Sequence, residues 1–151
     1  MSYWTLAMLF SIIPEKRIAE IFRKGKVGVI DQTVGSDDMV RIGEAGNRAD
    51  SLIDSYLRGH YDVPLVDGSE LCESSSILTA YNLLLQSESS AIDEKYVSLQ
   101  KQVMEFLKGI RDDKIVLHVN SRESGEKPKS SGIIGVVSSE REFGDNRLSQ
   151  F

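Results

Sequence analysis

The chain has 151 residues, of which 40% are hydrophobic and 27% charged, and its formal net charge is -5. This size and composition are typical of one soluble globular domain, and the acidic balance disfavours a protein that wraps nucleic acid through clustered Lys and Arg. The only cysteine in the sequence, Cys72, has no second cysteine to pair with, so the fold suits a reducing cytoplasm.

An apolar run from Tyr3 to Ile13 begins the predicted structure. It has no basic leader and no small-residue cleavage site, and Pro14 ends it short of the roughly 20 apolar residues that a membrane-spanning helix needs. We therefore expect a buried helix here, not a signal peptide or membrane anchor. Thr5 is placed to cap this helix, and Pro14 fits the first turn of a second short helix.

Residues 24–35 hold three glycines and a short apolar run, which predicts an ordered loop or a brief strand. A calcium-binding loop needs oxygen ligands at alternate positions, and this stretch lacks them. We therefore expect no metal site here.

From Ser36 onward, apolar residues recur at steps of three and four, which predicts a long helix. These residues are Ile42, Ala45, Ala49, Leu52, Ile53, Tyr56 and Leu57. Ser36 is expected to cap the start of the helix and Gly59 to end it as a left-handed stop. The loop that follows is predicted to be structural, with His60 capping or packing in it. Its marker residues are Tyr56, Gly59, Tyr61 and Pro64.

Two further helices are predicted, from about Ser69 and from about Ala91 to Lys108, with Gly109 ending the second. The apolar face of the first is wide, so this helix should lie between other helices or at a subunit boundary. That face comprises Leu71, Ile77, Leu78, Tyr81, Leu84 and Leu85, and Cys72 is expected to be a small core residue. A Ser-rich turn joins the two helices, which predicts an antiparallel hairpin.

Residues 114–119 are β-prone, and residues 120–132 are too polar to build a core. The large apolar side chains beyond them are costly to leave in water, since burying each is worth roughly 1.5 to 3 kcal/mol. We therefore predict a mainly α fold: a small bundle of about four to five helices with a short β-prone segment in residues 1–119, and an extended C-terminal arm, residues 120–151, that docks on a partner. The predicted docking residues are Ile133, Ile134, Val136, Val137, Phe143, Arg147, Leu148 and Phe151.

No group of residues in the sequence has the arrangement that catalysis needs. His60 and His118 lack Cys, Asp and Glu at metal-ligand spacing, and the adjacent acidic pairs would diverge on a helix. The run of three serines at residues 74–76 lacks the glycine-flanked elbow that presents a nucleophile. We therefore expect a protein that is not an enzyme and that uses no cofactor and no metal.

The segment from Tyr56 to Leu65, with the pattern Tyr-Leu-x-x-x-Tyr-x-x-Pro-Leu, resembles the corresponding segment of the Mu-like phage head-tail connector family. Further similarity is carried by Tyr3, Thr5, Ile30-Asp31, Gly109, Lys114-Ile115, Arg141-Glu142-Phe143 and the closing residues 147–151. The resemblance implies an adaptor, or head-completion, protein in the virion neck, made in the cytoplasm of the host bacterium. It also implies a homo-oligomeric ring of about twelve copies beneath the portal.

The partners that the resemblance implies are other copies of the chain, the portal protein, and a neck or tail-terminator protein below the ring. Genomic DNA would pass through without specific binding, and no membrane is involved. Because residues 121–151 sum to no net charge, the charge of -5 lies in the rest of the chain and would repel passing DNA. The alternatives are a tail-terminator or tail-completion ring protein, expected to be richer in strands, and a small DNA-binding regulator, for which no basic recognition helix is present.

Overall fold

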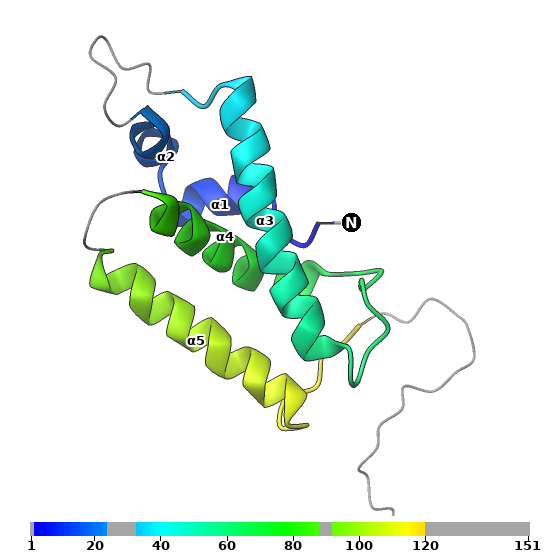
Figure 1. Ribbon diagram of the computed structural model, residues 1–151. Coiled ribbons are helices and arrows are strands. Elements are labelled where there is room, and N and C mark those ends of the chain that lie inside the picture. Colours follow the sequence, from blue (N-terminus) through cyan, green and yellow to red (C-terminus); the bar gives the residue numbers. More distant parts are fainter. Residues whose placement is uncertain (1, 24–32, 88–91, 120–151) are drawn as a thin grey trace, which may run out of the picture.

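The computed structural model describes residues 2–23, 33–87 and 92–119, and within these ranges the chain is helical, with no strand. The helices are α1 (Leu6–Ile12), α2 (Glu15–Arg23), α3 (Ser36–Leu57), α4 (Cys72–Gln86) and α5 (Glu94–Arg111), with a 3-10 turn, η1 (Ser69–Leu71), before α4. Figure 1 shows α4 and α5 running antiparallel, with α3 crossing them. The predicted small helical bundle and its hairpin are confirmed.

Helix α4 lies at the centre of the bundle and contacts α1, α2, α3 and α5. Small buried side chains on it, Ser75, Ser76, Thr79 and Ala80, let the neighbouring helices approach closely. The prediction that this helix lies between other helices is therefore confirmed. Leu85 was placed on its buried face, but its side chain is 57% exposed. It follows the buried Leu84 by one residue, which turns it about 100° away around the helix axis.

The buried side chains form two clusters along the bundle. One surrounds Ile53, Leu71 and Leu107, where α3, η1 and α5 meet, and the other surrounds Leu9 and Leu83, where α1 covers α4. None of the helices in the part of the chain that the structure describes is both long and apolar enough to cross a membrane.

The first helix begins as predicted, whereas the start of α3 differs from the prediction. The Thr5 hydroxyl accepts the N–H of Met8 at 3.3 Å. At α3, however, Gly35 is the N-cap and Ser36 already lies inside the helix. The Asp38 carboxylate accepts the N–H of Gly35 at 2.9 Å, so the acidic residue in the first turn does the capping that was assigned to the serine.

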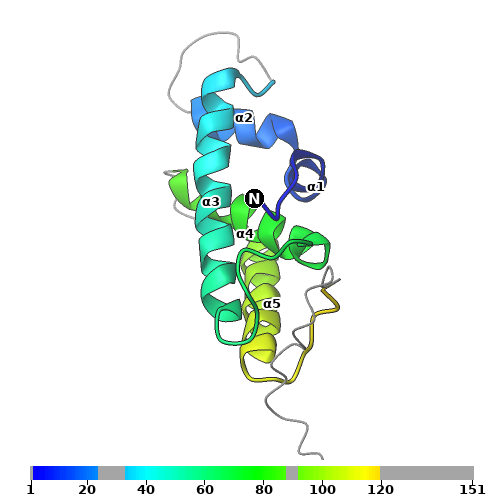
Figure 2. The same cartoon turned by 90° about the vertical axis from the view of Figure 1, so that its right-hand side faces the viewer.

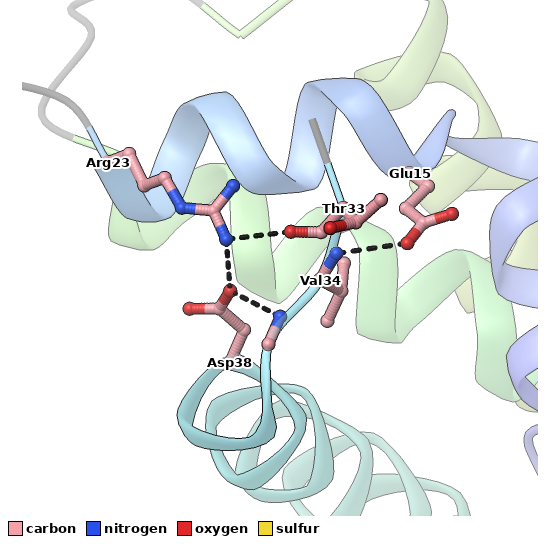
Figure 3. Close-up of polar contacts among 6 residues, drawn as sticks. Glu15, Arg23, Thr33, Val34 and Asp38 are labelled. Atoms are coloured by element: carbon pink, nitrogen blue, oxygen red, sulfur yellow. Dashed lines mark hydrogen bonds and ion pairs between the residues drawn. The ribbon is translucent and has the colours of Figure 1, made fainter. Parts of the chain in front are cut away.

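A polar link joins the end of α2 to the start of α3 (Figure 3). The Arg23 guanidinium donates to the Thr33 carbonyl at 2.7 Å and to the Asp38 carboxylate at 3.2 Å. At the other end of α2, the Glu15 carboxylate accepts the N–H of Val34 at 2.9 Å. Both ends of α2 are therefore tied to the residues that lead into α3, which fixes how the two helices lie together.

The end of α3 also differs from the prediction. The helix ends at Leu57, and Arg58 follows with a right-handed backbone (φ -53°). Gly59 does not adopt a left-handed conformation, so its predicted role as a left-handed stop is wrong. The chain turns because the Leu57 carbonyl accepts the N–H groups of both His60 and Tyr61 at 2.9 Å, a turn that any residue type can form at position 59.

The side chain of Tyr3 connects the start of the chain to its middle. Its hydroxyl donates to the Asp54 carboxylate at 2.6 Å and accepts the N–H of Leu65 at 2.8 Å. Its backbone N–H donates to the Asp50 carboxylate at 3.2 Å, and the Ser75 hydroxyl donates to the same carboxylate at 2.5 Å. We call these five residues the Tyr3 network. It joins the N-terminal segment, α3, α4 and the loop after α3.

Burial changes the acid-base properties of this network. It raises the pKa of Tyr3 to about 12, with the hydrogen bond to Asp54 acting in the same direction. Burial also raises the pKa of Asp50, against the lowering effect of the hydrogen bonds from Ser75 and the Tyr3 backbone. Both shifts follow from the cost of holding a charge away from water.

Two glycines inside α3 provide a matched test of the packing. A Cβ added to Gly46 would lie 2.0 Å from Nε1 of Trp4, whereas one added to Gly43 would have no heavy atom within 4 Å. We expect Gly46→Ala to lower the free energy of unfolding by about 1 to 3 kcal/mol, because the indole must move. Gly43→Ala should raise it by about 0.5 to 1 kcal/mol through its helix propensity. Urea denaturation measures both, and equal effects would contradict the packing of Trp4 on α3.

The raised pKa of Tyr3 predicts how stability depends on alkaline pH. Between pH 10 and about 12 the folded state retains a proton that the unfolded state releases, so the free energy of unfolding should fall across this window by roughly 2 kcal/mol. Tyr3→Phe should be less stable at pH 8, because the Leu65 N–H and the Asp54 carboxylate lose a partner, but its decline above pH 10 should be shallower. Tyr96→Phe, in the other core cluster, is the control and should keep the wild-type slope.

Candidate functional site at the root of the C-terminal arm

The predicted docking residues of the C-terminal arm cannot be placed, because the described chain ends at Val119. Ile133, Ile134, Val136, Val137, Phe143, Arg147, Leu148 and Phe151 therefore all lie outside the described residues. The predicted structural loop, in contrast, lies beside the last described residues. We call this loop, residues 58–65, together with residues 109–119, the arm root.

His60 attaches the loop to the end of α5. Its Nε2 lies 2.9 Å from the Arg111 carbonyl oxygen, and its Nδ1 lies 3.1 Å from the Asp113 carboxylate. The Arg111 guanidinium in turn stacks over the Tyr56 ring at 5.6 Å from the centroid. The expectation that His60 caps or packs in the loop is confirmed, and Tyr56 contributes through its ring.

Helix α5 ends three residues later than predicted, at Arg111, and Gly109 lies inside it. The left-handed residue that ends it is Asp113 (φ 58°), whose N–H donates to the Ile110 carbonyl at 3.1 Å. The Lys114 N–H donates to the Gly109 carbonyl at 2.8 Å, which completes a Schellman motif. Gly109 is needed for packing, since a Cβ there would lie 2.7 Å from Cδ1 of Ile115.

The β-prone residues 114–119 form no strand, because side chains take up their backbone groups. The Tyr61 hydroxyl accepts the N–H of Leu117 at 2.9 Å, and the Glu70 carboxylate accepts the N–H of His118 at 3.1 Å. Leu117 is buried, whereas Val116 and His118 on either side are exposed. The segment therefore has the alternation of a strand edge, but loop and η1 side chains take the place of a neighbouring strand.

The far end of the loop is fixed by the Tyr3 network, through the N–H of Leu65. Pro64 stands just before this contact, and the Val63–Pro64 peptide bond is cis. Gly59 makes no comparable contribution, since a Cβ there would meet no heavy atom within 4 Å. Of the four predicted loop residues, Tyr56 and Tyr61 thus make direct contacts with residues 109–119, and Pro64 precedes the hydrogen bond at Leu65.

Sequence reasoning missed three residues of this site: Glu70, Asp113 and Leu117. The signal for Leu117 was present, because Ile115, Leu117 and Val119 alternate with polar or exposed neighbours. Glu70 and Asp113 gave no such signal, since the roles of both depend on residues about 50 positions away in the sequence. In the described ranges, no three His, Cys, Asp or Glu side chains gather as metal ligands would. The charged groups of the arm root instead hold backbone and side chains in place.

A family model described as bacteriophage Mu, Gp36 matches residues 3–135. The match includes every described helix and the arm root, and it continues past Val119 into the C-terminal arm. Residues 136–151 lie beyond it, including Arg141-Glu142-Phe143 and the closing residues 147–151. No curated protein matches the chain. Because the match covers most of its length, the chain belongs to the bacteriophage Mu Gp36 family.

Proposed function

We propose that this phage protein is a structural component of the virion, a head-tail connector that forms a ring beneath the portal, joins the head to the tail and lets DNA pass. The arm root is the observation that carries the proposal. Four side chains, His60, Tyr61, Glu70 and Asp113, hold the segment that leads into the C-terminal arm. An arm that leaves a folded body from a fixed point and in a fixed direction suits attachment to a neighbouring virion component.

The mechanism is mechanical. Helices of neighbouring copies pack into the ring, and each C-terminal arm buries Phe143, Leu148 and Phe151 on the portal, with Arg147 available for an acidic partner group. Because the copies of a ring bind together, a modest affinity for each arm gives a stable joint through effective concentration. A fixed arm root adds to this affinity, since less conformational freedom is lost on docking.

The charge distribution supports passage of DNA without retention. The formal charge of -5 resides in the residues before 121, because the remainder of the chain sums to zero. Acidic groups facing the channel would repel phosphates and keep DNA from adhering. A predominantly basic channel in the assembled ring would contradict this part of the proposal.

The helical fold bears on the competing functions. A tail-terminator or tail-completion protein is expected to be rich in strands, whereas the described residues form helices and no strand. A DNA-binding regulator would need a recognition helix rich in basic and amide side chains, and the exposed face of α3 instead mixes acidic, basic and apolar residues. The connector remains the function with the most support, and the protein would act without catalysis, cofactor or metal.

Deleting residues 138–151 tests the arm directly. We expect the truncated protein to keep its helical circular dichroism spectrum but to lose most of its attachment to portal-containing heads, because the aromatic and aliphatic anchors are gone. Co-sedimentation with purified heads measures attachment. A matched control replaces Ser138, Ser139 and Ser149 with Ala and should attach normally. Undiminished attachment of the truncated protein would defeat the arm hypothesis.

A second experiment tests the arm root. Tyr61→Phe removes the hydroxyl that accepts the Leu117 N–H, so hydrogen exchange at the Leu117 amide should accelerate at least tenfold while exchange at the buried Leu107 amide stays unchanged. Attachment to heads should weaken by about threefold to tenfold, equal to roughly 1 kcal/mol for one neutral hydrogen bond. Faster exchange with no change in attachment would mean that a fixed root is not needed for docking.

A further inference from the structure

A hollow of about 440 Å³ lies next to the arm root, between the N-terminal segment and the residues that lead into α4. Tyr3, Leu65, Val66 and Cys72 line it with mostly apolar atoms, and Asp67 also belongs to its lining. Cys72 was expected in the core but is only half-buried, with its Sγ 3.7 Å from the Thr5 hydroxyl. The hollow therefore presents apolar surface that the described residues leave open.

The two most exposed large hydrophobic side chains among the described residues belong to the hollow and to the arm root. Val66, which lines the hollow, is 67% exposed, and Val116, in the arm root, is 69% exposed. Leaving such side chains in water forgoes the favourable free energy of burial. A covering segment that reaches both the hollow and the arm root would remove this exposure.

The chain itself passes beside the hollow before it reaches residue 120. The His118 N–H is bound by Glu70, which directly follows Ser69, a residue of the hollow's wall. Figures 1 and 2 show the segment after α5 running back toward the turn that precedes α4. The C-terminal arm thus begins within a short distance of the hollow.

The family match gives an independent reason to assign the covering segment to this chain. It continues sixteen residues beyond Val119, to residue 135, although residues 120–132 are mainly polar. The first apolar stretch after them is Ile133 to Val137. Thirteen residues separate Val119 from Ile133, and the fourteen Cα-to-Cα steps between the two can span up to about 46 Å, more than enough to reach the hollow.

Charge also favours this occupant. Lys127 and Lys129 lie just before the apolar stretch in the sequence. Asp67 lines the hollow, and Glu70 and Glu73 lie in the adjoining 3-10 turn and in the first turn of α4. Opposite charges at the rim would guide a basic and then apolar segment into place.

We propose that this hollow is the docking site for residues 133–137 of the same chain. The tether keeps the local concentration of the segment near the millimolar range, so a chain occupies its own hollow in preference to that of another copy. Ile133, Ile134, Val136 and Val137 then belong to the body of the protein, in contrast to the partner contact expected from sequence, and only residues 138–151 are free to reach a partner. The inference does not depend on the ring or the portal.

The position of Cys72 in the wall of the hollow allows a cross-linking test in the full chain. Ile133, Ile134, Val136 and Val137 are replaced by Cys one at a time, and each variant is oxidised mildly at two protein concentrations tenfold apart. We expect at least one variant to form a disulfide with Cys72 within one chain, seen as faster migration in a non-reducing gel with the same yield at both concentrations. Leu148→Cys is the matched control and should stay largely reduced, and adding Cys72→Ser should abolish the bond.

Two results would overturn the proposal. Disulfide-linked dimers whose yield rises with concentration would place the segment in the hollow of another copy. No bond above the level of the Leu148→Cys control, at any of the four positions, would mean that the segment docks elsewhere.

A second measurement avoids engineered cysteines. Ile134→Asp should increase the rate of alkylation of Cys72 by iodoacetamide at least fivefold, because the charged side chain opposes docking, whereas Phe143→Asp should leave the rate unchanged. Equal rates in the two variants would also reject the docking. Attachment to heads, which depends on residues 138–151, is a separate readout, so failure of this inference and failure of the connector role can be told apart.

Discussion

The phenol of Tyr3 is held between the Asp54 carboxylate and the backbone of Leu65, and the position of the loop after α3 depends on these two contacts. It fixes one end of the loop after α3, and the last turn of α3 fixes the other. Between these two points, Tyr61 is positioned to accept the N–H of Leu117. The beginning of the chain therefore helps decide where its C-terminal arm starts, although the two are far apart in the sequence.

The buried carboxylate of Asp50 is stabilised because both of its oxygens have a hydrogen-bond partner. Asp50 is 8% exposed, yet both of its carboxylate oxygens accept hydrogen bonds, one from the Tyr3 backbone and one from Ser75. Removing one partner would leave a buried acceptor unsatisfied, which costs more than the bond itself contributes. Carboxylates play a similar part at the surface of the arm root. Glu70 accepts the backbone N–H of His118, and Asp113 lies against the imidazole of His60.

Much of the fold could be predicted from the sequence, because the apolar residues on the buried face of a long helix recur every three to four positions. The apolar periods correctly indicated α3, α4 and α5 and the hairpin of the last two. The role of Gly109 was misassigned, because a glycine after a helical pattern serves equally as a left-handed stop or as a space for a neighbouring side chain. Gly59 serves as neither, because the turn there is closed by hydrogen bonds to the Leu57 carbonyl. Only the tertiary structure shows that Ile115 packs on Gly109 and that Asp113 ends α5. Asp50 was missed for a similar reason. Its role depends on hydrogen bonds from Tyr3 and Ser75, which only the tertiary structure brings close to it.

The hydrogen bonds of the arm root also order the events of folding. The Tyr61–Leu117 bond joins residues 56 positions apart, and the Tyr3–Leu65 bond joins residues 62 apart. Contacts this distant in sequence require the closure of long loops, so they form after the local helices. The ordered arm root is thus a late product of folding, and a newly synthesised copy acquires it only when the bundle has closed. Under the proposed connector role, incomplete copies would lack the geometry for incorporation, and assembly would be selective for finished protein without a separate checkpoint.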